Sequence, residues 1–163
     1  MLCVNIGNSN IGIAYLNIIE QYSQNSTQKY SLKNGSEQSF SYNIDYEFKI
    51  KTSLEKNARD YFELINKNIK ELSNKKKIEN CPVSISSVVP AIDGIICEVF
   101  EKYFKIKPYF IRYHNNLKLK QRILIRNPEK IGIDRIANAE YCVEHFGDNK
   151  NLIIIDSGTA TTI

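Results

Sequence analysis

The sequence predicts a layered α/β fold with helices packed on a β-sheet, because strand-like and helix-like stretches alternate along most of the chain. Short apolar runs bounded by Gly, Asn, Ser or Pro are typical of strands. Between them, apolar residues recur at steps of three and four, which is typical of amphipathic helices. The expected order is three strands followed by three helix–strand units.

The three N-terminal strands are predicted at residues 2–6, 11–19 and 46–51. A Gly-Asn-Ser turn joins the first two, so we expect them to pair as a hairpin. Residues 20–45 are rich in Gln, Asn, Ser and Tyr and show little periodicity, which indicates a long polar hairpin or a mobile insertion.

The three helices are predicted at residues 54–73, from Pro90 onward, and at residues 133–146 with Gly147 ending the last one. The first helix carries apolar residues at helical spacing: Leu54, Ala58, Tyr61, Phe62, Ile65, Ile69 and Leu72. The strands that follow the helices are predicted at residues 82–89, 109–113 and 152–155. The aromatic residues expected to pack in the core are Tyr103, Phe104, Tyr109 and Phe110.

The composition is that of one globular domain rather than two complete ones, with 163 residues, 42% hydrophobic and 25% charged. The net charge is +4, but Lys and Arg are scattered and form no stripe with interleaved aromatics, so we expect no nucleic-acid partner. Four cysteines without CxxC spacing argue against a zinc site and a disulfide framework, and for a reducing compartment. No apolar run reaches the roughly 20 residues of a membrane span, so we expect a cytoplasmic protein with no membrane partner.

Two glycine-centred turns follow predicted strands and have the composition of phosphate-binding loops. Residues 5–10 read Asn-Ile-Gly-Asn-Ser-Asn, in which backbone N–H groups and side-chain donors can surround a phosphate. An ordinary hairpin turn is the alternative. Residues 156–162 read Asp-Ser-Gly-Thr-Ala-Thr-Thr, which combines a carboxylate that can hold a cation with hydroxyls that can meet phosphate oxygens. Here the alternative is an Asx or Ser/Thr turn.

A third candidate is the run Gly132-Ile133-Asp134-Arg135 at the start of the last predicted helix. Adjacent Asp and Arg residues at a helix N-terminus suit the binding of an acid and the activation of a hydroxyl. The alternative is that Asp134 only favours the helix dipole and pairs with Arg135 at the surface.

Taken in order, these motifs resemble the type III pantothenate kinases, whose pattern runs D-x-G-N-[ST], S-S-V-V-P, N-P-x-x-x-G-x-D-R and D-x-G-T-A-T-T. The matching segments are Asn5 to Ser9, Ser86 to Pro90, Asn127-Pro128 with Gly132 to Arg135, and Asp156 to Thr162. The resemblance covers the chain apart from residues 20–45. It implies an actin-like, ribonuclease H-like domain in residues 1–150, with a mixed sheet and helices on both faces. Residues 151–163 would then form the first strand and phosphate turn of a second, similar domain.

The resemblance also implies a reaction, the ATP-dependent phosphorylation of pantothenate to 4′-phosphopantothenate, which is the first step of coenzyme A biosynthesis. Asp134 corresponds to the catalytic base, and the substrate-binding positions are Gly132, Ile133, Asp134 and Arg135. Asp156 corresponds to the acid that binds a monovalent cation, K⁺ or NH₄⁺, while Mg²⁺ accompanies ATP. The ATP-binding positions are Asn5, Ile6, Gly7, Asn8, Ser9, Asn10, Ile11, Gly12 and Thr159. Family members are dimers, so a homodimer is expected.

Three features depart from the family pattern. Asn5 stands where the family has Asp, which removes a carboxylate near magnesium and should weaken catalysis. Ile125 stands where many relatives have a substrate-contacting Tyr. The chain stops at Ile163, one residue past the second turn, so we expect it to be the N-terminal part of a longer kinase. The alternative function is that of a non-catalytic relative, which binds pantothenate or nucleotide as a regulator or partner protein.

Overall fold

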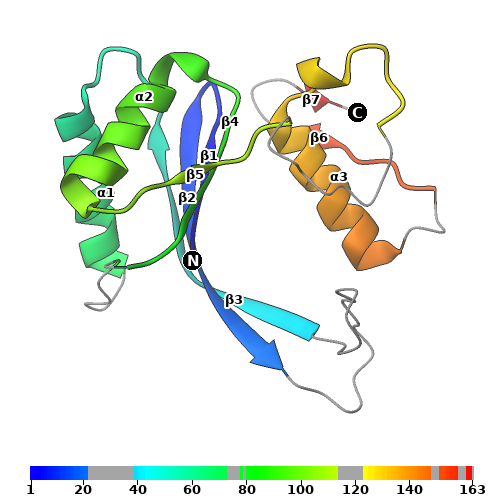
Figure 1. The fold of residues 1–163 in the computed structure, drawn as a ribbon, viewed down its shortest axis with the longest axis horizontal. Coiled ribbons are helices and arrows are strands. Elements are labelled where there is room, and N and C mark those ends of the chain that lie inside the picture. The colour runs from blue at the N-terminus through cyan, green and yellow to red at the C-terminus, as the bar shows by residue number, and fades with distance from the viewer. Residues whose placement is uncertain are drawn as a thin grey trace.

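A five-stranded mixed sheet lies at the centre of the structure, which is a computed structural model (Figure 1). The structure describes residues 1–21, 39–72, 78, 80–113, 123–147, 151–157 and 161–162. The strands are β1 (Leu2–Ile6), β2 (Asn10–Gln21), β3 (Ser39–Lys51), β4 (Val83–Ser87) and β5 (Tyr109–Phe110). Their order in the sheet is β3-β2-β1-β4-β5. The first three are antiparallel, whereas β4 pairs parallel to β1 and β5 parallel to β4, so the predicted α/β sheet is confirmed as a mixed one.

The polar stretch at residues 20–45 is in part a hairpin, because β2 and β3 remain paired as far as Gln21 and Ser39. A register shift between Tyr15 and Leu16 interrupts the ladder, and beyond it the two strands form an arm that leaves the sheet (Figure 1). Bulges of this kind bend and twist a strand pair. Strand β3 therefore begins earlier than the predicted residue 46, while residues 22–38 lie outside the described part of the chain.

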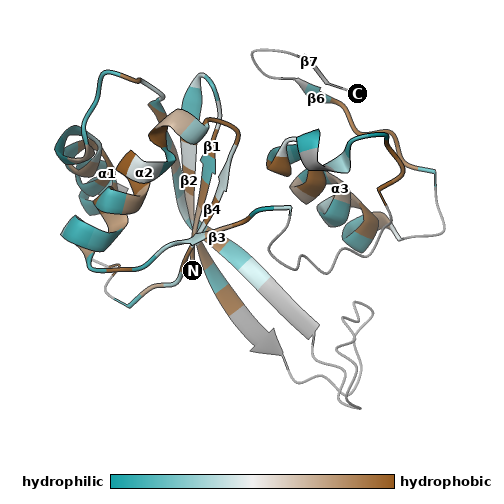
Figure 2. Ribbon diagram, turned by 45° about the horizontal axis from the view of Figure 1, so that its top comes forward, coloured by the Kyte–Doolittle hydropathy of each residue, from teal (hydrophilic) through white to brown (hydrophobic). Residues whose placement is uncertain are grey.

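The main core lies between the sheet and two helices, α1 (Ala58–Leu72) and α2 (Pro90–Glu98), which cover the same face (Figures 1 and 2). Side chains alternate along a strand, and in β1 this alternation buries Leu2, Val4 and Ile6 on that face. The helices contribute fully or nearly buried side chains: Ala58, Tyr61, Ile65, Ile69, Ile92 and Ile96. Helix α2 is the more hydrophobic of the two (Figure 2) and continues as a π-helix, η1 (Val99–Phe104).

Helix α1 begins at Ala58 rather than at the predicted residue 54, because Asn57 caps it. The Asn57 Oδ1 accepts hydrogen bonds from the backbone N–H groups of Arg59 and Asp60 at 2.9 and 3.1 Å. In return, the Asp60 carboxylate accepts from the Asn57 N–H at 3.0 Å, which is the reciprocal arrangement of a capping box. Leu54 fits the helical spacing but precedes this cap and is 68% exposed.

The third helix, α3 (Ile133–Phe146), has the predicted bounds and lies on the other side of the sheet from α1 and α2 (Figure 1). A short 3-10 helix, η2 (Pro128–Lys130), precedes it. Gly147 ends α3 with φ of 93°, a value that disfavours residues with a side chain, and its N–H donates to the Val143 carbonyl at 2.9 Å. Ile133 and Ile136 are the residues of α3 that are buried.

The strand predicted at residues 152–155 is wrong. Residues 151–155 join no strand ladder in the described part of the chain, and Ile153 and Ile155 are 82% and 65% exposed. An apolar run becomes a buried strand only where a neighbouring strand pairs with it. Instead, β6 (Asp156–Ser157) pairs antiparallel with β7 (Thr161–Thr162).

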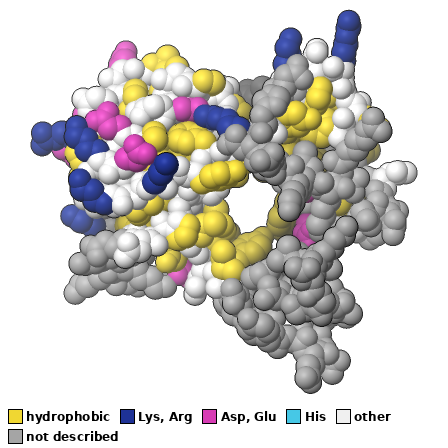
Figure 3. Space-filling model, viewed as in Figure 1, with side chains coloured by type: hydrophobic (Ala, Val, Ile, Leu, Met, Phe, Trp, Pro, Cys, Tyr) yellow, Lys and Arg dark blue, Asp and Glu magenta, His cyan; other side chains and the backbone are white. Residues whose placement is uncertain are grey.

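Smaller predictions have mixed outcomes. The aromatic core is confirmed for Tyr103, Phe104 and Phe110, which pack against the main core, and wrong for Tyr109, which is 53% exposed at the sheet edge. The four cysteines are free thiols. Among the described helices, none combines the length and apolarity that crossing a bilayer would require. Lys and Arg side chains are interspersed with Asp and Glu over α1 and α2 (Figure 3).

Candidate functional site

The candidate site lies at one edge of the sheet, where the parallel strands β1 and β4 both end. Parallel strands bring their carboxyl ends to the same edge, and ligands of open α/β sheets bind there. The first glycine turn leaves β1 at this edge, and the Ser-Ser-Val-Val-Pro segment leaves β4 beside it. The Val88 N–H donates to the Ile6 carbonyl at 3.0 Å and extends the pairing one residue past β4.

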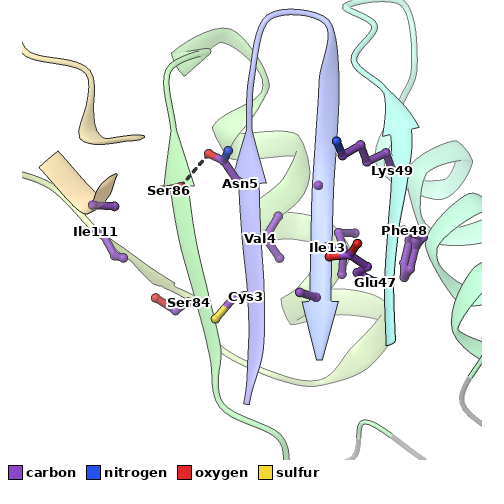
Figure 4. A pocket seen from close by; sticks show the side chains of 13 residues that line it. Cys3, Val4, Asn5, Ile13, Glu47, Phe48, Lys49, Ser84, Ser86 and Ile111 are labelled. Carbon is purple, nitrogen blue, oxygen red and sulfur yellow. Dashed lines mark hydrogen bonds between the residues drawn. The ribbon is translucent and has the colours of Figure 1, made fainter. Parts of the chain in front are cut away.

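Asn5 and Ser86 form the first polar contact of the site. They are directly paired across β1 and β4, and the Ser86 hydroxyl donates to the Asn5 Oδ1 at 2.8 Å (Figure 4). Their side chains project from the face opposite the main core, because Val4 and Ile6 on either side of Asn5 point inward. Asn5 is thus held at the site by a neighbour that lies 81 residues away in the sequence.

The turn at residues 7–10 is braced by the end of β3. Within the turn, the Gly7 N–H donates to the Asn10 carbonyl at 2.9 Å. From β3, the Thr52 hydroxyl donates to the Gly7 carbonyl at 2.7 Å, and the Thr52 N–H donates to the Ser9 carbonyl at 3.0 Å. A side chain on Gly7 would bring its Cβ within 3.2 Å of the Asn10 carbonyl oxygen, so the close turn favours glycine at this position.

The acidic start of α3 packs against the end of β4. A Cβ placed on Gly132 would lie 3.4 Å from Val88 Cγ1, which shows how closely the two segments approach. Asp134 occupies the first turn of α3, and its Oδ1 accepts the backbone N–H of Arg135 at 2.9 Å. The Arg135 side chain is exposed, and no ion pair with Asp134 is found within the described residues.

Asp156 is connected to α3 through Asn138. The Asn138 Nδ2 donates to the Asp156 Oδ2 at 3.2 Å. Asn138 follows Asp134 by four residues, so the two side chains lie on the same face of the helix, one turn apart. The two carboxylates named by the sequence motifs are therefore brought to the same side of α3.

A pocket of about 540 Å³ opens on the outer face of the sheet between the strands and α3 (Figure 4). Its floor consists of outward-facing residues of neighbouring strands: Cys3, Asn5, Gly12, Ala14, Ser84 and Ser86. Glu47 and Lys49 of β3 bound it on one side and Ile111 on the other (Figure 4), and Ala137 of α3 also lines it. Burial raises the pKa of the Cys3 thiol in the floor of this pocket, so that the thiol stays protonated at neutral pH.

The structure thus brings Asn5 together with its turn, and it places Asp134 and Asp156 on the same side of α3. Thr159 and Gly158 of the second turn lie outside the described residues, and Ile125 is 52% exposed in the segment before η2. The motifs alone did not reveal Lys49, Thr52 and Asn138. The signal that could have found Lys49 and Thr52 is the β2–β3 register, which places the end of β3 beside the first turn.

The described residues offer few metal ligands. No cluster of three or more His, Cys, Asp or Glu side chains is found among them. Asp156 leaves its Oδ1 without a hydrogen-bond partner in the described part of the chain, so one carboxylate oxygen is available to a cation. A single available carboxylate oxygen fits a loosely held cation, whereas Mg²⁺ bound with a nucleotide keeps several waters and is held largely by the phosphates.

Comparison with known proteins identifies the family. A family profile described as type III pantothenate kinase matches residues 1–163. Proteins named type III pantothenate kinase are similar over part of the chain. The one from Legionella pneumophila (strain Corby) is 42% identical over 80 residues, which are 49% of this chain and 30% of the relative. The one from Persephonella marina is 40% identical over 88 residues, or 54% of this chain and 32% of the relative. The one from Citrifermentans bemidjiense is 41% identical over 80 residues, or 49% and 30%.

The protein is an α/β domain of a class consistent with an actin-like kinase. This class is indicated by the five-stranded mixed sheet and by the glycine turn that lies beside the acidic start of α3. The particular family follows from the profile match over the whole chain: the chain belongs to the type III pantothenate kinases. The matched segment spans about a third of the length of these curated relatives.

Proposed function

We propose that the protein transfers the γ-phosphoryl group of ATP to the 4′-hydroxyl of pantothenate and so forms 4′-phosphopantothenate, the first product on the route to coenzyme A. The observation that carries this proposal is the meeting of the family's motifs at one sheet edge. The first glycine turn, the end of β4 and the start of α3 lie side by side there. The relatives that carry the name of this activity support it.

In this proposal Asp134 is the catalytic base that takes the proton of the pantothenate hydroxyl. A base of this kind contributes roughly 10²- to 10⁴-fold to the rate. Arg135 would bind the substrate carboxylate, helped by Gly132 and Ile133, because guanidinium groups match the geometry of carboxylates. The Arg135 N–H that holds the Asp134 carboxylate at 2.9 Å also orients this base.

Residues 5–12 and Thr159 would bind ATP, and Asp156 would hold a monovalent cation, K⁺ or NH₄⁺. Support for the first loop comes from its bracing by Thr52, which leaves the turn ordered before any ligand arrives. Mg²⁺ bound with ATP supplies positive charge beside the β- and γ-phosphates. The Asn138 amide would orient the Asp156 carboxylate by donating to one of its oxygens.

We also propose a ribonuclease H-like fold for residues 1–150, with residues 151–163 starting a second, similar domain. The strand order β3-β2-β1-β4-β5, with α1 and α2 on one face and α3 on the other, supports the first part. We further propose a homodimer located in the cytoplasm. The four free cysteines suit a reducing compartment.

A second candidate function rests on Asn5. An amide replaces the carboxylate of the family pattern, which favours a relative that binds pantothenate or nucleotide without turnover. Catalysis of phosphoryl transfer depends on stabilising charge, so the loss of one carboxylate bears on the rate more than on binding.

The test measures pantothenate-dependent ADP release by the full chain. Asp134→Asn is expected to lower kcat at least 100-fold with little change in the melting temperature. Glu71→Gln serves as a charge-matched control, because it changes an exposed carboxylate of α1. Unchanged turnover in Asp134→Asn would remove this residue from the chemistry. Ligand binding without turnover, with turnover gained in Asn5→Asp, would favour the second function.

A further inference from the structure

Four residues form a row across the outer face of the sheet, one from each of four neighbouring strands. Ser86 of β4 pairs with Asn5 of β1, Asn5 pairs with Gly12 of β2, and Gly12 pairs with Lys49 of β3. All four line the pocket (Figure 4). The row therefore presents polar side chains on both sides of a glycine.

The direction of the Asn5 amide is set by Ser86. Because the Ser86 hydroxyl donates to the Asn5 Oδ1 at 2.8 Å, the amide nitrogen points away from Ser86 and towards β2 (Figure 4). On the far side of β2, the Lys49 side chain extends back towards Asn5 (Figure 4). Within the described residues, neither the Asn5 Nδ2 nor the Lys49 Nζ has a hydrogen-bond or ion-pair partner.

The space between these two donors is open. A Cβ on Gly12 would have no atom within 4 Å. Neighbouring strands lie about 4.8 Å apart, so the backbones that carry Asn5 and Lys49 are separated by about 10 Å. A group the size of a phosphate or carboxylate fits between an amide and an ammonium that reach towards each other across this distance.

We propose that this row is an anion subsite, in which Asn5 Nδ2 and Lys49 Nζ together bind one phosphate or carboxylate group of a ligand above Gly12. The two unpartnered groups are both donors, and an anion is the ligand that satisfies both. Glu47, the next outward residue of β3, also lines the pocket, and its charge confines an anion to the Lys49 end. The identity of the anion rests on the proposed function, which assigns ATP to residues 5–12 and the pantothenate carboxylate to Arg135, so an ATP phosphate is the expected anion.

This subsite gives the asparagine at position 5 a direct role. An aspartate there would place a negative charge beside the anion, whereas the amide donates a hydrogen bond to it. Ser86 acts as a positioning residue, because its hydroxyl decides which end of the amide faces the ligand.

The experiment compares Lys49→Met with Lys49→Arg, and with Lys70→Met on the exposed side of α1 as a control that removes the same charge. Calorimetric titrations of the full chain use two pairs of ligands: MgATP with adenosine, and pantothenate with its neutral alcohol, pantothenol. A charged hydrogen bond contributes about 1.5–3 kcal/mol. Lys49→Met is therefore expected to weaken one anionic ligand about 10- to 100-fold. The neutral partner of that ligand, the Lys49→Arg variant and the Lys70→Met variant should bind almost as the parent does.

The pattern of lost affinity identifies the anion or overturns the subsite. A loss confined to MgATP assigns the subsite to a phosphate, and a loss confined to pantothenate assigns it to a carboxylate. Equal affinities of Lys49→Met and the parent for both anions would overturn the proposal, as would an equal loss for a neutral partner.

Failure of the proposed function is distinguishable from failure of the subsite. If the parent binds neither MgATP nor pantothenate, the proposed function fails, and pyrophosphate then probes the subsite alone. An NMR shift of the Asn5 side-chain amide that saturates with pyrophosphate in the parent, and is lost in Lys49→Met, would support the subsite. No such shift in the parent would overturn it.

Discussion

Gly132→Ala is the substitution that most directly separates the activity of this protein from its stability. The Gly132 backbone has φ of −58° and ψ of 134°, which alanine adopts without strain. The added Cβ, however, would lie under 3.0 Å from the Asp134 Oδ1, closer than real Cβ contacts allow. Val88 Cγ1 blocks the other side at 3.4 Å, so the Asp134 carboxylate is the group that must move.

The size of both effects follows from this geometry. Restoring an ordinary contact displaces the carboxylate by about 1 Å, and a misplacement of that size in a reacting group costs roughly 100-fold in rate. For stability, the displaced carboxylate loses its hydrogen bond to the Arg135 N–H. Because this charged hydrogen bond is exposed, its loss costs about 1.5 kcal/mol, the lower end of the range for such bonds. Replacing glycine by alanine offsets about 0.4–1 kcal/mol of this cost by restricting the unfolded chain. The free energy of unfolding is thus expected to fall by about 0.5–1 kcal/mol.

The assay pairs pantothenate-dependent ADP release with urea unfolding of the same preparation. Gly94→Ala in α2 is the matched control, because its added Cβ meets no atom within 4 Å. That variant should keep full activity and gain about 0.5–1 kcal/mol of stability. Full activity in Gly132→Ala would refute the reasoning, since it would mean that the position of the Asp134 carboxylate does not limit the rate.

Two further predictions concern tyrosines of the main core. Tyr61 is fully buried, and its hydroxyl donates to the Ser53 carbonyl and accepts from the Ser53 N–H, both at 2.8 Å. Tyr61→Phe should therefore lower the free energy of unfolding in urea by about 1–3 kcal/mol. An unchanged midpoint of urea unfolding would contradict this prediction. Burial raises the pKa of Tyr46 from 10.0 to about 12, so the folded state favours the neutral phenol. The resulting contribution to the free energy of unfolding is fully present below pH 10 and is lost as the pH rises towards 12. Between pH 9 and 11, the parent should therefore lose roughly 1 kcal/mol more stability than Tyr46→Phe, a value reduced to allow for solvent screening; parallel pH profiles of the two proteins would exclude it.

Helix ends could be predicted from the sequence where a local residue determines them. Gly132 and Gly147 flank α3, and its predicted bounds are confirmed. The start of α1 was predicted four residues early, because the apolar period includes Leu54 although the cap signal lies at Asn57. Periodicity counts apolar positions, whereas a cap depends on one side chain that bonds to the first turn. The π-helix at the end of α2 gave no periodic signal of its own.

Features that depend on pairing could not be predicted from the sequence in the same way. The run at residues 152–155 has the composition of a buried strand, but a strand also needs a partner, which the sequence of one segment does not supply. The site shows the same difference. Asn5 and Asp134 were found from motifs, whereas Lys49 and Ser86 join Asn5 only through the strand order and register.

Asp156 is oriented by a contact with helix α3, and not by a strand that directly precedes it. With residues 151–155 outside any strand ladder of the described chain, no sheet contact orients Asp156 from the preceding side. Its described side-chain contact is the 3.2 Å hydrogen bond from Asn138. Asn138 is one turn from Asp134 on the same helix, whose start packs on β4 beside the first glycine turn. One helix therefore positions both the proposed base and the amide that contacts the proposed cation ligand, because a rotation of α3 would move Asp134 and Asn138 together relative to the turn that holds Asn5.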